Sequence, residues 1–150
     1  MENPVVGMKA EVQVTGLSHD GQGVARLGSH VLFINGALPG ESIRARLTYK
    51  AKRHWLAEME ELLQPSPDRQ KPPCILADKC GGCSLQHFSD AGQGHWKQQK
   101  VVDALERIAH LNHPVKPLLG CEPSLGYRNR AIIPLERLDD GRIKAGYYRP

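Results

Sequence analysis

The chain has 150 residues, enough for one domain or two small ones. Apolar residues make up 40% and charged residues 24%, a balance that is typical of soluble globular proteins and argues against a disordered or fibrous chain. No stretch approaches the roughly 18 consecutive apolar residues of a membrane span, and the first residues lack the basic and apolar regions of a secretion signal. We therefore expect a cytoplasmic protein with no membrane partner.

Residues 8–63 predict a series of short β-strands. In the first strand Val12 and Val14 alternate with polar neighbours, and the last strand runs from Trp55 to Leu63. Between them lie four turn-forming stretches, each with glycine, at residues 18–23, 27–29, 35–36 and 39–40. Five short strands within about 55 residues predict a small closed barrel of the OB type.

Residues 41–55 hold an unusual concentration of positive charge. They contain five Lys or Arg residues against Glu41 alone, an excess equal to the net charge of +4 on the whole chain. Apolar residues alternate with Arg44 and Arg46 here, so both arginines should point outward from the barrel. Such a patch attracts polyanions, although a strand edge kept soluble by its charges is an alternative.

The segments after the barrel predict three further features. Four prolines in residues 64–73 indicate a stiff linker that does not pack, and a Cys- and Gly-rich loop follows over 74–88. A helix is expected next, with Ser89 as its N-cap and a body from about 93 to 110. The remainder should be extended, with a hairpin whose arms are 130–135 and 143–148.

The predicted fold class is mainly β with one long helix. A five-stranded OB-like barrel is followed by a Cys-rich loop, then by a helix and the start of a central β domain. We place the three parts at residues 1–63, 64–95 and 96–150.

The cysteines form the most specific motif. Cys74, Cys80 and Cys83 have the spacing Cys-x5-Cys-x2-Cys, and the Gly-Gly pair lets the last two thiolates turn toward one centre. Three clustered cysteines with a distant fourth ligand are typical of a [4Fe-4S] cluster. Zinc with His87 as fourth ligand, or three thiols without metal, are the alternatives. Cys121 can be either a fourth ligand or a small buried apolar residue.

Two segments of the expected barrel resemble a known RNA-binding domain. Residues 18–26 read Ser-His-Asp-Gly-Gln-Gly-Val-Ala-Arg, and residues 37–41 read Ala-Leu-Pro-Gly-Glu. They resemble the first hairpin and the following loop of a TRAM domain.

Later segments resemble, in the same order, the RNA uracil-C5 methyltransferases of the TrmA/RumA (RlmD) type. Residues 65–69, 74–83 and 86–87 are similar to the cluster region of that family. Residues 126–130 (Gly-Tyr-Arg-Asn-Arg) and 146–150 (Gly-Tyr-Tyr-Arg-Pro) are similar to its central region. A TRAM domain ahead of the cluster resembles the family members that act on 23S rRNA.

The resemblance implies an enzyme that uses S-adenosylmethionine. A cysteine thiolate adds to C6 of uracil, and a carboxylate later removes the C5 proton. The catalytic and cofactor-binding residues of the family match nothing in this chain, so no catalytic residue is assigned and the chain alone is expected to be inactive. Cys74, Cys80 and Cys83 match the cluster ligands of the family, with the fourth ligand expected beyond residue 150. Cys121 matches no ligand, which favours burial.

We expect the partner to be ribosomal RNA (23S), with no obligate protein partner. The expected RNA-binding residues of the barrel are Arg44, Arg46, Lys50, Lys52 and Arg53. His54 or Trp55 can stack on a base, although core packing is favoured for Trp55. Arg128 and Arg130 are expected to contact RNA phosphates or the cluster loop, with a surface salt bridge as the alternative.

Two other functions stay open at this point. One is a stand-alone RNA-binding module without catalysis, made of the barrel and the metal loop. The other is a zinc-stapled interaction domain unrelated to RNA.

Overall fold

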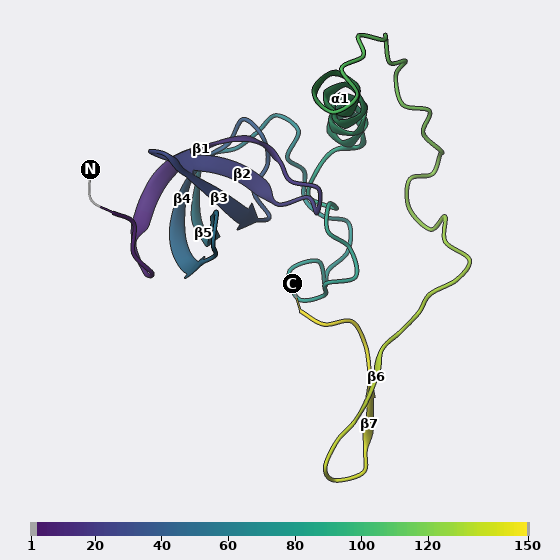
Figure 1. Ribbon diagram of the computed structural model, residues 1–150. Helices are drawn as coiled ribbons and strands as arrows, with labels where there is room; N and C mark the ends of the chain where they lie inside the picture. Colours follow the sequence, from purple (N-terminus) through teal and green to yellow (C-terminus); the bar gives the residue numbers. More distant parts are fainter. Residues whose placement is uncertain (1–2, 150) are drawn as a thin grey trace. The chain divides into compact units, whose positions relative to one another are not determined.

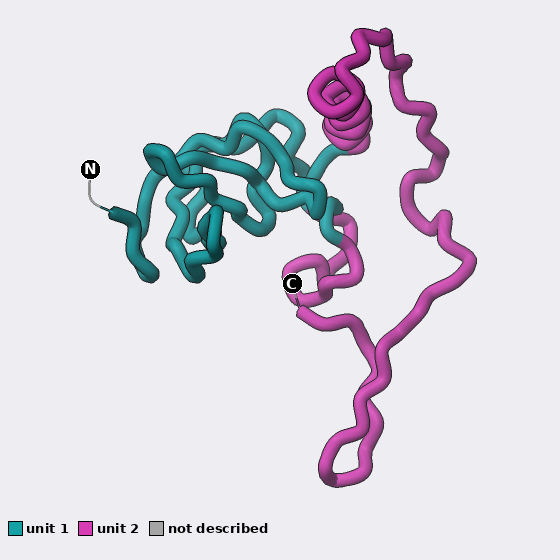
Figure 2. The backbone as a smooth tube through the Cα atoms, in the orientation of Figure 1, with its two compact units in different colours: residues 1–71, 84–89 teal, residues 72–83, 90–150 magenta. Residues whose placement is uncertain are grey.

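The computed structural model describes residues 3–149, which divide into two compact units (Figure 2). Unit 1 takes the described residues up to Lys71 together with Ser84–Ser89. Unit 2 takes Pro72–Cys83 and the described residues from Asp90 onward. The chain therefore leaves unit 1 after the linker, forms the cysteine loop, and returns to unit 1 for six residues. The three-part division expected from the sequence stays a prediction.

Unit 1 is a closed five-stranded barrel (Figure 1). Its strands are β1 (Lys9–Leu17), β2 (Gly23–Leu27), β3 (His30–Asn35), β4 (Ser42–Lys50) and β5 (Trp55–Gln64). They close in the order β1-β2-β3-β5-β4, and β3 runs parallel to β5 while the other neighbours are antiparallel. This confirms the predicted fold class of a mainly β chain with an OB-like barrel and one long helix.

The barrel interior is filled by alternate residues of all five strands, as the period of two requires. Leu32, Ile34, Ile43 and Leu47 are fully buried there. Trp55 is 3% exposed and belongs to the same core, so core packing is confirmed for this residue. Base stacking by Trp55 is therefore wrong, because burying the indole in the barrel leaves no ring face for a ligand.

Gly23 lies where β2 passes closest to the segment between β3 and β4. A Cβ atom on Gly23 would meet the Cβ of Ala37 at 2.7 Å and its carbonyl oxygen at 2.8 Å. We expect Gly23→Ala to lower the free energy of unfolding by about 2 kcal/mol, because overpacking forces the backbone to shift. Gly16→Ala is the matched control, since a Cβ there meets nothing within 4 Å. Urea denaturation of both variants checks this, and equal midpoints would contradict it.

The helix α1 (Asp90–Arg107) belongs to unit 2 and begins directly after Ser89, the expected N-cap position. The helix begins and ends three residues earlier than expected. Its C-terminus is set by His110, which takes a positive φ of 53°, and by the hydrogen bond from the Leu111 amide to the Leu105 carbonyl, 2.8 Å long. A left-handed residue at this place ends the helical hydrogen-bond pattern.

The expected hairpin is present but shorter than predicted. Its strands are β6 (Leu135–Arg137) and β7 (Ile143–Ala145), joined by a turn in which Gly141 has a φ of +81°. Residues 130–134 lie outside the strand, and Pro134 at this end lacks an amide to donate to a ladder. The hairpin confirms the predicted turn and corrects the length of both arms.

Buried apolar side chains are distributed unequally between the units. Within residues 3–149, every buried apolar side chain lies in unit 1. Unit 2 exposes many large apolar side chains, including Leu119 at 96% and Ile108 at 80%. In the same described part of the chain, no helix has the length and apolar character needed to cross a membrane.

Candidate functional site

The two outward-facing arginines of β4 are paired with acidic side chains of the neighbouring strands. Arg44 and Arg46 are each 40% exposed at the side chain, so the predicted orientation is confirmed. Arg44 Nη2 lies 2.9 Å from a carboxylate oxygen of Glu11. Hydrogen bonding to Glu11 and the charge of Glu61 raise the pKa of Arg44. The carboxylate partners of the two arginines are Glu11, Glu58, Glu60 and Glu61.

Lys9 completes this arrangement, with its Nζ 2.8 Å from Glu60, and the hydrogen bond from Lys9 lowers the pKa of Glu60. The set then holds three cations and four carboxylates, so it has no net positive charge. We call it the ionic network; its members are Lys9, Glu11, Arg44, Arg46, Glu58, Glu60 and Glu61. A phosphate group that binds Arg44 or Arg46 must displace a carboxylate, so RNA contacts by these arginines stay a prediction.

The loop between β4 and β5 presents its cations differently. Lys50 at the end of β4 and Lys52 and Arg53 in the loop are exposed, and within residues 3–149 no carboxylate lies within ion-pair distance of them. The hydrogen bond from the Ala51 amide to the His54 carbonyl, 2.9 Å long, closes the loop. Lys52 and Arg53 are therefore available to a polyanion without prior loss of an ion-pair partner, whereas the Lys50 Nζ lies over the Trp55 ring, 5.7 Å from its centroid.

A buried carboxylate holds the end of the barrel together, and sequence reasoning missed it. Glu41 is fully buried and accepts hydrogen bonds from the Leu38 amide at 2.8 Å and the Ser66 amide at 3.3 Å. Arg69 donates to it through both Nε and Nη2, and Nη2 also donates to the Gly36 carbonyl at 2.6 Å. This bidentate pair fastens the segment after β5 onto the loop before β4.

The Pro-rich segment therefore departs from its predicted character. Ser66 is only 6% exposed, so the expectation that residues 64–73 do not pack is wrong for this part. The reason is the Glu41 carboxylate, which satisfies the Ser66 amide and holds the Arg69 side chain. The returning residues 84–89 join the same place through a β-bridge between Arg69 and Phe88.

His87 lies in this returning segment and was the predicted zinc alternative. Its Nε2 atom is buried and has no hydrogen-bond partner among the described residues. Burial and the nearby Arg69 charge lower the pKa of His87, so the neutral imidazole is favoured. Nothing in unit 1 supplies cysteine ligands beside this nitrogen.

The cysteine loop of unit 2 is a compact turn. The Ala77 amide donates to the Cys74 carbonyl at 3.2 Å, and the Cys80 amide donates to the Leu76 carbonyl at 2.8 Å. The Gly82 amide points at the Cys80 sulfur, 3.4 Å away. The thiolate is the form of cysteine that binds metals.

The two glycines of this loop are in contact with the segment that follows β7. The Gly81 amide donates to the Tyr148 carbonyl at 2.8 Å. A Cβ on Gly82 would meet Cδ2 of the Tyr147 ring at 3.0 Å, so a larger residue here would require the ring to move slightly. The motifs at 80–83 and 146–148, far apart in the sequence, are therefore neighbours within unit 2.

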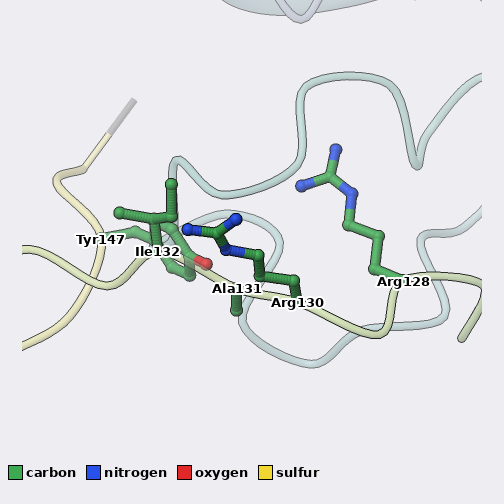
Figure 3. A pocket seen from close by; sticks show the side chains of 5 residues that line it. All are labelled: Arg128, Arg130, Ala131, Ile132 and Tyr147. Carbon is green, nitrogen blue, oxygen red and sulfur yellow. The ribbon is translucent and has the colours of Figure 1, made fainter.

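Arg128 and Arg130 lie beside this contact. They line an open pocket together with Ala131, Ile132 and Tyr147 (Figure 3). The Arg130 side chain extends toward Ile132 and Tyr147, while the Arg128 guanidinium projects separately. Hydrogen bonding to Tyr127 raises the pKa of Arg128, with a smaller contribution from Cys83. Contacts of Arg128 and Arg130 with RNA phosphates or with the cysteine loop stay a prediction.

The cysteine side chains suit a metal by their chemistry, but the structure does not bring them together as a ligand set. Cys74 and Cys83 are exposed and Cys80 is half-buried. Within residues 3–149 no three Cys, His, Asp or Glu side chains are grouped as a metal site. A cluster held by Cys74, Cys80 and Cys83 therefore stays a prediction. Metal binding often completes such a loop, because thiolates gather only when the metal holds them.

The barrel is similar to a known domain family. Residues 5–56 match the TRAM domain family. The chain contains a TRAM domain. The matched residues include the ionic network strands β1 and β4 and the cationic β4–β5 loop.

Beyond the TRAM domain, almost the whole chain is similar to proteins named as uncharacterized RNA methyltransferases. One from Parasynechococcus marenigrum is 42% identical over 146 residues, which are 97% of this chain and 31% of the relative. One from Synechocystis is 44% identical over 144 residues, 95% of this chain and 31% of the relative. One from Listeria innocua is 41% identical over 139 residues, which are 93% of this chain and 30% of the relative. The chain thus spans about a third of the length of the curated relatives it matches.

These findings bear out the resemblance to RNA methyltransferases that carry a TRAM domain. The finer resemblance to enzymes that act on C5 of uracil stays a prediction. One expectation tied to that resemblance is wrong. Cys121 was expected to be buried, but it is exposed. It lies in a long segment without regular structure in unit 2, which offers no core to receive it.

Proposed function

We propose that this chain is the RNA-binding, N-terminal portion of a cytoplasmic methyltransferase that uses S-adenosylmethionine to methylate C5 of uracil in 23S rRNA. The TRAM domain and the printed names of the relatives support the proposal. The observation that carries it is the cationic group formed by Lys50 at the end of β4 and by Lys52 and Arg53 in the β4–β5 loop, which are exposed and lack carboxylate partners among residues 3–149. No residue of this chain is proposed to take part in the methyl transfer.

Arg128 and Arg130 provide the second proposed contact with RNA phosphates. Their pocket in unit 2 combines two guanidinium groups with the Tyr147 ring (Figure 3). Guanidinium groups bind phosphate oxygens in a bidentate manner, and an aromatic ring can stack on a base. The pocket therefore has the side chains that an RNA segment needs.

The test compares two sets of charge-removing variants. Replacing Lys50, Lys52 and Arg53 together by glutamine should lower the affinity for a ribosomal RNA fragment about a hundredfold at 0.1 M salt, since three phosphate contacts are lost. The slope of log affinity against log salt concentration should fall by about two, as measured by filter binding.

The matched control replaces Arg44 and Arg46 by glutamine. These arginines are already neutralised by the ionic network, so the same measurement should change less than about threefold. If the loop variant retains the affinity and salt slope of the unmodified chain, the β4–β5 loop does not bind RNA and the proposal fails.

We also propose that Cys74, Cys80 and Cys83 provide three ligands of a [4Fe-4S] cluster. The amide that points at the Cys80 sulfur and the close contacts at Gly81 and Gly82 support this assignment. When bound, the cluster supplies a rigid crosslink rather than electron transfer. Because Tyr147 and Arg128 lie at the same loop, ordering the cysteines would also order the pocket that they line.

A further inference from the structure

Two segments of unit 1 that lie on either side of the cysteine loop pair with each other. The Ser89 amide donates to the Asp68 carbonyl at 2.8 Å, and the Gln70 amide donates to the His87 carbonyl at 2.9 Å. These bonds flank the β-bridge described above, so the two segments run antiparallel. We call the paired segments the clamp; its residues are 66–71 and 84–89.

Side chains add to this backbone pairing. Ser89 Oγ donates to Asp68 Oδ1 at 2.8 Å. Gln70 Nε2 donates to the carbonyl oxygens of Gln86 at 3.1 Å and Phe88 at 3.4 Å. A two-stranded pair this short is marginally stable by itself, so the side chains of Asp68 and Gln70 should contribute much of the free energy that keeps the clamp closed.

The barrel holds each segment of the clamp separately. In the first segment the Arg69 side chain is bound by the buried Glu41 carboxylate. In the second segment Phe88 is 3% exposed. The Leu85 side chain of this segment lies against the turn between β1 and β2, where a Cβ on Gly21 would meet its Cδ2 at 3.1 Å. Each segment is therefore fastened to the barrel as well as to the other segment.

The clamp joins the two ends of the cysteine loop. This loop, Pro72–Cys83, contains all three candidate ligands and begins and ends at the clamp segments. A metal that gathers thiolates from an open chain must also bring the chain ends together, and the entropy lost in doing so weakens its binding. A loop of about twelve residues whose ends are already joined loses less entropy, so its thiolates should bind a metal more tightly.

We infer that the clamp closes the cysteine loop before any metal binds, with Asp68 and Gln70 as positioning residues for the proposed metal site. Neither side chain is a ligand, and both act by holding the two segments together. The inference rests on the proposed function, in which the three cysteines of the loop bind a cluster, and it specifies what prepares them for it. The barrel thereby has a second role, as the support of the metal loop.

The first experiment measures whether the clamp is closed without metal. It uses the full-length protein that the gene encodes, stripped of metal by a chelator under anaerobic conditions, and follows hydrogen exchange in peptides that cover 66–71 and 84–89. Their amides should exchange about tenfold or more slowly than in an unstructured peptide, with or without metal. If they exchange at the unstructured rate until iron and sulfide are restored, the metal closes the loop and the inference is wrong.

The second experiment measures how fast the iron-loaded full-length protein loses iron to a chelator. The double variant Asp68→Ala/Gln70→Ala removes the side-chain bonds across the clamp and should lose iron about tenfold faster, since the loop is then closed for a smaller fraction of the time. Asp68→Asn keeps an acceptor for the Ser89 hydroxyl and should lose iron within about twofold of the unmodified rate.

The matched control is Thr15→Val/Thr48→Val, which removes two side-chain hydrogen bonds to strand carbonyls of the barrel, 3.2 and 3.1 Å long. It should leave the rate of iron loss unchanged. Faster loss in this control would trace the effect to general destabilisation and overturn the positioning role. Hydrogen exchange of β1 and β4 peptides in the same samples should be unchanged by the clamp variant, which shows that the barrel stays folded.

The outcomes separate the inference from the proposed cluster. If the clamp variant keeps its iron as long as the unmodified protein, Asp68 and Gln70 do not position the ligands, although the proposed cluster stands. If the unmodified full-length protein binds no iron, the proposed cluster fails and the inference fails with it. The exchange measurement needs no variant, so it decides the inference even where the double variant does not fold.

Discussion

Replacement of Glu41 by glutamine is expected to lower the free energy of unfolding of the chain by about 3 kcal/mol. Glutamine keeps the size of the side chain, so the loss of stability measures the effect of removing the negative charge. It leaves the Arg69 guanidinium, whose side chain is only 20% exposed, without a carboxylate partner. It also weakens the acceptor for the Leu38 and Ser66 amides. Urea denaturation followed by circular dichroism measures the change.

The control is Glu58→Gln, which removes a carboxylate that is equally paired with an arginine but 62% exposed. An exposed pair contributes less than about 1 kcal/mol, so this variant should be close to the unmodified chain. If both variants lose the same free energy of unfolding, burial does not increase the contribution of the Glu41–Arg69 pair to stability.

The effect of Glu41 on stability should depend on pH in a defined direction. Burial raises the pKa of Glu41, but the hydrogen bond from Arg69, the Leu38 and Ser66 amides and the Arg69 charge together outweigh it and lower the pKa. A lowered folded-state pKa contributes stability above the unfolded value, and this contribution is lost as pH falls through the folded value. The difference between the unmodified chain and Glu41→Gln should therefore be largest near neutral pH and shrink below about pH 4.

Replacement of Cys80 by serine should abolish iron binding. We expect the protein, purified anaerobically in the full length that its gene encodes, to contain iron and sulfide and to absorb broadly near ~400 nm. Cys80→Ser should reduce bound iron by roughly tenfold or more. The reason is that removing a metal ligand lowers the metal affinity more than removing a residue that only supports a ligand. Iron and sulfide analysis and the visible spectrum measure this.

Cys121→Ser is the matched control, since Cys121 is an exposed cysteine outside the loop. It should retain the full iron content and spectrum. Loss of iron in this variant would make Cys121 a ligand and correct the proposed set. If the purified protein is colourless and contains zinc, the loop binds a structural zinc ion in place of the cluster. If it contains neither metal, the loop has a purely structural role.

The barrel was predictable because its signals are local. Alternation such as Val12 and Val14, with glycine at the turns, depends only on neighbouring residues, and the five strands follow from it. The burial of Trp55 and the outward direction of Arg44 and Arg46 follow from the same period of two. The helix was found with bounds shifted by three residues, because its end is set by the backbone of His110, which periodicity does not report.

The candidate site was predictable only as a set of residue types. The excess of cations in 41–55 was evident, but not the difference between the paired Arg44 and the unpaired Lys52. That difference arises because β1 and β5 bring glutamates beside β4, and strand neighbours are separated by many residues in the chain. The exposure of Cys121 likewise depends on whether a core is available around it.

By itself, the sequence determined the strands, the turns, the position of the helix to within one turn, and the family of the barrel, since each of these depends on short-range patterns. Only the tertiary structure decided which charges are neutralised and which residues close the barrel end through Glu41 and Arg69. The physical reason is that pairing and burial are properties of distant residues in contact. The strand register decides which glutamates lie beside Arg44 and Arg46, and no local pattern encodes it.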